Sequence, residues 1–148
     1  MSDAGDTLPE GWPFFIGEAF VAALREAPAL AGASVLDNPV RLSDLTDGER
    51  IVFFEDVSDG PAQADEGGKR VYRYNVGVVN RTEAARRGAH GDYRAARRAL
   101  KAALPRLKPK GLIVNFHREG EIAFRLENID VGGGLVLGTF TIGYRDPS

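Results

Sequence analysis

Apolar residues recur at helical spacing in two parts of the chain. The first run begins at Ile16 and ends at Pro28, which cannot continue a helix. The second predicts a helix over residues 91–104, with Asp92 as an N-terminal cap and Pro105 ending it. Its apolar stripe consists of Tyr93, Ala96, Leu100, Ala103, Leu104 and Leu107. We therefore expect two helices, each with one face against a core.

Runs with the period of a β-strand separate and follow these helices. In residues 70–80 the side chains of Tyr72, Tyr74, Val76 and Val78 share one face. Segments 112–117 and 121–129 can pair across a Glu119-Gly120 turn, and the glycines 132–134 lead into the last strand. A short extended piece is also expected near Val40–Leu42, within a long connection. The predicted strands are 51–57, 70–80, 112–117, 121–129 and 135–145.

The resulting order of elements is α-β-β-α-β-β-β. Because hairpins dominate, we expect an α+β fold in the broad α/β class, with a mostly antiparallel sheet of four to five strands and both helices on one face. Residues 1–13 are predicted to be a flexible N-terminal arm, although Trp12 to Phe15 are too apolar to remain in solvent. Residues 14–148 form the single predicted domain.

Composition narrows the chemistry that the chain can perform. Cysteine is absent, which excludes disulfides, thiolate nucleophiles and cysteine-ligated zinc. The net charge of −2 is unevenly distributed, because residues 81–110 hold ten Lys or Arg against Glu83 and Asp92. This segment carries +8, and the remainder of the chain carries −10. Such a dipole could meet DNA, or the acidic side of another copy.

The predicted second helix concentrates this positive charge. Arg94, Arg97, Arg98 and Lys101 lie opposite its apolar stripe at spacings of three and four, where like charges repel. Three interpretations stay open: a solvated face, contact with phosphates, or salt bridges to an acidic neighbouring subunit. A second candidate is the polar loop 58–69, in which Asp59, Asp65, Glu66 and Lys69 could dock a partner.

No catalytic signature stands out. His117 and Glu119 form an HxE fragment, but the paired cysteines of a zinc deaminase are missing. His90 has no evident partner, and the run 110–116 lacks the stacking aromatics of an RNA-recognition strand. We therefore expect no catalytic residue, no cofactor and no metal site. We also expect no membrane partner, because no apolar run approaches the roughly 20 residues of a membrane span.

Several segments together resemble the tail terminator proteins of long-tailed bacteriophages, a family that includes lambda-like minor tail and tail-completion proteins. They are IGEAFVAALREAP, IVFFEDV, VYRYNVGVVN, DYRAARRALKAAL and ENIDVGGGLVLGTFTIGYRD. The resemblance extends from about residue 14 to 146 and concerns element order, length and the closing pattern.

The resemblance implies a structural virion protein, assembled in the cytoplasm of a bacterial host, and no reaction. Its subunits would form a homo-oligomeric ring of six, cap the tail tube, end tube polymerisation and present a surface to the head-tail connector. Genomic DNA would pass through the lumen without sequence recognition. Arg94, Arg97, Arg98 and Lys101 would act between subunits or in the lumen. The alternatives are a non-specific nucleic-acid-binding module that uses helix 91–104, or another neck or head-tail connector protein.

Overall fold

The structure is a computed structural model, which describes residues 9–39, 45, 48–62, 68–125 and 133–145. Its helices are α2 (Trp12–Glu26) and α3 (Ala85–Ala103), with 3-10 turns η1 (Pro28–Leu30) and η3 (Leu104–Lys110). The strands are β1 (Ser34–Asp37), β2 (Arg50–Pro61), β3 (Lys69–Asn80), β4 (Ile113–Arg125) and β5 (Gly134–Arg145). No helix within the described ranges combines the length and apolar character that a membrane crossing requires.

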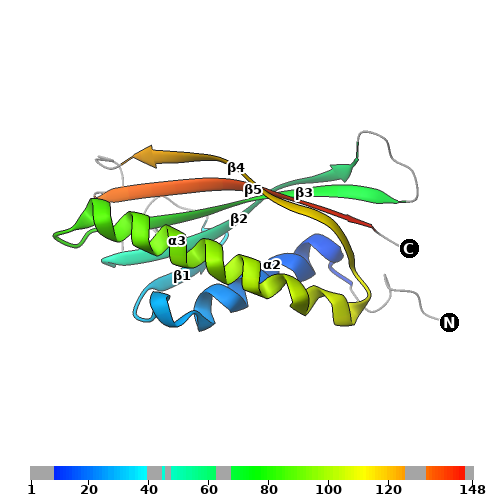
Figure 1. Cartoon of the computed structure of the whole chain (residues 1–148), viewed down its shortest axis with the longest axis horizontal. Coiled ribbons are helices and arrows are strands. Elements are labelled where there is room, and N and C mark those ends of the chain that lie inside the picture. The colour runs from blue at the N-terminus through cyan, green and yellow to red at the C-terminus, as the bar shows by residue number, and fades with distance from the viewer. Residues whose placement is uncertain (1–8, 40–44, 46–47, 63–67, 126–132, 146–148) are drawn as a thin grey trace.

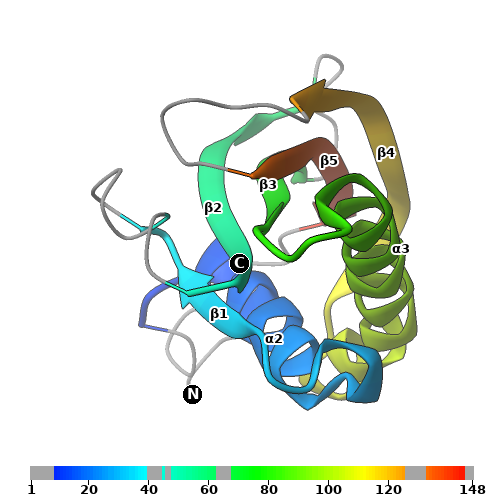
Figure 2. The ribbon, with the colours of Figure 1, turned by 90° about the vertical axis from the view of Figure 1, so that its left-hand side faces the viewer.

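The strands form one sheet in the order β1-β2-β3-β5-β4. Only β1 and β2 run parallel, and the other neighbours are antiparallel. Both helices pack on the same face, where α2 contacts β1 and β2 while α3 contacts β3 and β5 (Figure 1, Figure 2). The predicted α+β class is confirmed.

The predicted order of elements is wrong in two places, and the observed order is α-β-β-β-α-β-β. The first strand is Ser34–Asp37. The extended piece expected near Val40–Leu42 follows it in the chain and lies outside the described residues. Segments 112–117 and 121–129 do not form a hairpin. They belong largely to one strand, β4, because a register shift between Glu119 and Ile122 accommodates the Glu-Gly pair within the strand.

Both helices begin earlier than the apolar periodicity predicts. Helix α2 starts at Trp12, and Pro13 suits its first turn because a helix leaves its first N–H groups unpaired. The Trp12 side chain lies in the core, so Trp12 and Pro13, which we assigned to the arm, belong to the domain. Residues 1–8 of the arm lie outside the described residues. Helix α3 starts at Ala85 rather than near Gly91.

Aromatic rings fill the layer between the helices and the sheet. The ring of Tyr74 on β3 stacks on Phe54 and Phe140, with centroids 5.0 and 5.3 Å apart, and Phe20 of α2 lies 5.2 Å from it. The predicted face of β3 is confirmed, because its four side chains are all buried: Tyr72, Tyr74, Val76 and Val78. On β5 the side chains of Val136, Phe140, Ile142 and Tyr144 are buried as well.

A smaller apolar cluster covers part of the opposite sheet face. It contains Ile51, Phe53, Val79 and Leu135. The ring of Phe53 lies directly over Gly77, where any Cβ would overlap it. Glycine is therefore required at this position of β3 by close packing rather than by a turn.

A candidate interaction surface on helix α3

Helix α3 separates apolar and basic residues as its sequence predicts. Tyr93, Ala96, Leu100 and Ala103 are buried against the sheet and α2. The four predicted site cations, Arg94, Arg97, Arg98 and Lys101, are all exposed. The interior of the protein thus fixes the orientation of the helix, and the basic side faces outward.

The four cations form two rows rather than one. Arg94 and Arg98 are one turn apart, and Arg97 and Lys101 form a parallel row about 60° around the helix axis. Arg97 donates to Glu119 of β4 at 2.9 Å, and Tyr93 donates to the other oxygen of that carboxylate at 2.7 Å. Arg97 is therefore partly neutralised within its own subunit.

The other three cations of the helix, unlike Arg97, are not neutralised by a described residue. The side chains of Arg94, Arg98 and Lys101 make no hydrogen bond or ion pair with another residue that the structure describes. With respect to the residues that the structure describes, these three side chains are therefore available to an external anion, and no described carboxylate offsets their mutual repulsion within the helix.

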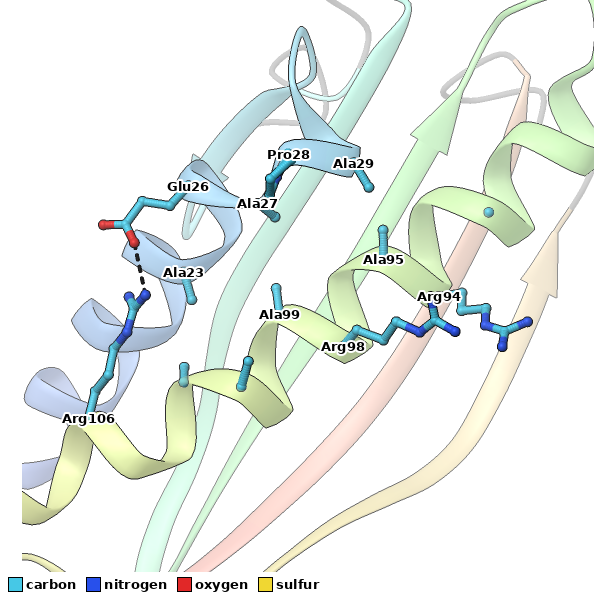
Figure 3. A pocket seen from close by; sticks show the side chains of 13 residues that line it. Ala23, Glu26, Ala27, Pro28, Ala29, Arg94, Ala95, Arg98, Ala99 and Arg106 are labelled. Carbon is cyan, nitrogen blue, oxygen red and sulfur yellow. Dashed lines mark ion pairs between the residues drawn. The ribbon is translucent and has the colours of Figure 1, made fainter.

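A groove runs between α3, the end of α2 and η1, and Arg94 and Arg98 are among the residues of α3 that line it. In Figure 3 these two side chains extend along the side of α3 that is turned away from α2. Its volume is about 510 Å³. At one end Arg106 pairs with Glu26 at 3.0 Å, with both side chains more than half exposed. Small residues line most of the groove: Ala23, Ala27, Pro28, Ala29, Gly91, Ala95, Ala99, Ala102 and Ala103. The sequence alone does not indicate the groove, although the alanines at 95, 99 and 102 follow helical spacing.

The wall of the groove is held in place by Arg50. This side chain donates to Asp92 of α3 at 2.8 Å and to the main-chain oxygens of Ala29 and Ala31 beside η1 at 3.1 and 3.0 Å. Asn80 also donates to Asp92, at 3.0 Å. The prediction of Asp92 as an N-terminal cap is wrong, because Asp92 lies inside α3 and joins the helix to β2 and β3.

The predicted docking loop is shorter than expected. Ser58 to Pro61 belong to β2 and Lys69 begins β3, while Asp65 and Glu66 lie outside the described residues. Asp59 accepts hydrogen bonds from Arg70 and from Tyr144, both at 2.8 Å. Its carboxylate therefore has partners within the subunit, which weakens its assignment to docking.

His117 lies in the aromatic layer rather than in a metal site. Its Nε2 atom is hydrogen-bonded to the hydroxyl of Tyr74, and its ring stacks on Phe140 with centroids 5.7 Å apart. Among the described residues, no group of His, Asp and Glu side chains is arranged to hold a metal ion. Burial lowers the pKa of His117, and the charge of Glu119 opposes this shift.

Replacement of His117 by glutamine is expected to reduce the loss of stability in mild acid. The pKa of His117 is lower in the folded protein than in the unfolded chain. The contribution of the neutral His117 ring to the free energy of unfolding is therefore fully present above about pH 6.5, and it is lost as the pH falls toward the folded-state pKa. The loss is expected to be less than about 1 kcal/mol at pH 5.5, since the ring is only half-buried. Urea unfolding of both proteins at pH 7.5 and 5.5 measures it, and an equal loss in the variant would contradict the assignment.

No protein-family model matches the chain, and a comparison with curated proteins also finds no match. The groove places cations beside apolar surface, an arrangement that can bind a partner that carries both negative charge and apolar side chains.

Proposed function

We propose that the chain is a structural subunit of a bacteriophage tail. Six copies would close into a ring on the tail tube, end tube polymerisation and form the surface that joins the head-tail connector. The observation that carries this proposal is the basic side of α3, where Arg94, Arg98 and Lys101 have no partner among the described residues of their own subunit. A ring joins two different patches of each subunit, so a basic patch and an acidic remainder can meet head to tail.

A second candidate function is non-specific binding of nucleic acid, and it is favoured by the same three cations, which have no partner in the described part of the chain. Phosphate binding would weaken steeply with salt, because each neutralised phosphate releases counterions. Two features make it the weaker candidate. Arg97 already pairs with Glu119, and the surface beside Arg94 and Arg98 is an apolar groove rather than a continuous basic face.

Lys101 allows the ring to be tested without altering the groove, because it does not line the groove. The purified chain, added to polymerising tube protein, is expected to stop tube growth and to form a ring at the tube end. Lys101→Glu is expected to weaken capping about tenfold, since it replaces attraction to an acidic neighbour by repulsion. Tube length by electron microscopy and mass by light scattering measure the two effects.

Lys108→Glu, an equal charge change on η3, serves as the matched control and is expected to cap tubes normally. Tubes that grow without limit in the presence of the unaltered chain would overturn the proposal. A stable monomer that instead retains duplex DNA at low salt would favour the second candidate.

A further inference from the structure

The groove between α2 and α3 has the size and lining of a binding site. Its volume of about 510 Å³ lies within the range of roughly 300–1,000 Å³ that is typical of ligand pockets. Alanine, proline and glycine line most of it, so apolar side chains of a partner can approach the helices closely. Figure 3 shows the alanines of α2 and α3 projecting into the space between the helices.

The charges around the groove favour a partner that carries negative charge. Among the described residues, the charged side chains that line the groove are Arg94, Arg98, Arg106 and Glu26, which together carry a net charge of +2. Arg106 and Glu26 already pair, so Arg94 and Arg98 are the two cations without a partner among the described residues. They are one helical turn apart, or about 6 Å along the axis. Carboxylates at i and i+4 of a helix, or at i and i+2 of an extended segment, match this separation.

We propose that the groove binds a short acidic segment of a partner protein. Apolar side chains of the segment would occupy the alanine-lined floor, and its carboxylates would pair with Arg94 and Arg98. This binding needs only one subunit, so it does not depend on the ring.

A protein segment fits the lining better than nucleic acid does. Single strands bind through aromatic side chains on which bases stack, and none of the described residues that line the groove is aromatic. A duplex presents one charge per roughly 1.7 Å of its axis and would leave the apolar floor uncovered. A peptide can supply both the apolar side chains and the carboxylates.

Selection from a library of random 12-residue peptides tests the proposal, with the Arg94→Gln/Arg98→Gln variant used in advance to remove peptides that bind elsewhere. The recovered peptides are expected to combine Asp or Glu with apolar residues. A fluorescein-labelled copy of a recovered peptide is then expected to bind the double variant at least about tenfold more weakly than the unaltered protein, because charge-assisted hydrogen bonds are lost. Fluorescence polarisation of the dilute monomer measures both affinities.

Two single substitutions test separately how the alanine-lined floor and the positive charge contribute to peptide affinity. Ala102→Leu places a larger side chain at an exposed position of the groove and is expected to weaken the peptide without changing any charge. Lys101→Gln removes a cation of the same helix that lies outside the groove, and it is expected to leave binding unchanged.

Several outcomes would overturn the proposal. They are the recovery of no peptide that depends on Arg94 and Arg98, the recovery of peptides without acidic residues, and unchanged binding in Ala102→Leu. Binding of a 20-base-pair duplex that depends on the two arginines, without peptide binding, would also overturn it. Because peptide binding by the dilute monomer and tube capping are measured separately, failure of the groove can be distinguished from failure of tube capping.

Discussion

Asp92→Ala is expected to lower the free energy of unfolding by about 3 kcal/mol, because it leaves the Arg50 guanidinium without its counter-ion. Asp92 is only 7% exposed and accepts from both Arg50 and Asn80. Removing one partner of such a pair costs more than the pair contributes, since the remaining charge stays desolvated. Urea unfolding, followed by circular dichroism, measures the change.

Glu26→Ala is the matched control for this experiment. It also removes the carboxylate of an arginine pair, but the side chains of Glu26 and Arg106 are 61% and 51% exposed. Exposed pairs contribute at most about 1 kcal/mol, so the control is expected to lose far less stability. Equal losses in the two variants would show that the Arg50–Asp92 pair has no special structural role.

The hydrogen bonds of Arg50 also determine the shape of the proposed binding groove. Arg50 holds the carbonyls of Ala29 and Ala31 as well as Asp92, so it fixes η1 relative to α3. Ala29 lines the groove. Loss of Asp92 is therefore expected to weaken peptide binding as well as folding, even though Asp92 does not line the groove.

Much of the sheet could be predicted from local sequence alone. Strands β3 and β5 alternate apolar and polar residues, because one face of each packs against the helices, and this period is directly visible in the chain. The same reasoning applies to the buried stripe of α3. The exposed basic residues of α3 could be predicted for the same reason, since the apolar stripe fixes which side faces outward.

The errors arise where distant parts of the chain decide the structure. Glu119-Gly120 has the composition of a turn, but pairing with β5 on both sides of a bulge keeps β4 continuous. Asp92 has the composition of a helix cap, but Arg50, 42 residues earlier, takes it as a buried partner. The groove likewise requires the relative placement of α2, η1 and α3, which no single segment specifies.

Gly138→Ala is expected to destabilise the protein by about 2–4 kcal/mol, because α3 packs directly on this position of β5. An added Cβ would overlap the Tyr93 hydroxyl, and Gly138 is buried between Val76 and Ile122 of the neighbouring strands. Tyr93 would have to move, and its hydrogen bond to Glu119 would be lost. Thermal and urea unfolding measure the loss of stability.

Gly91→Ala provides a control of the same chemistry with the opposite expected sign. Gly91 lies inside α3, and an added Cβ would meet no atom within 4 Å. Alanine there is expected to stabilise the helix by up to about 1 kcal/mol, because glycine is the poorer helix former. The contrast depends on where α3 contacts the sheet, so a neutral Gly138→Ala would mean that Tyr93 does not pack over β5.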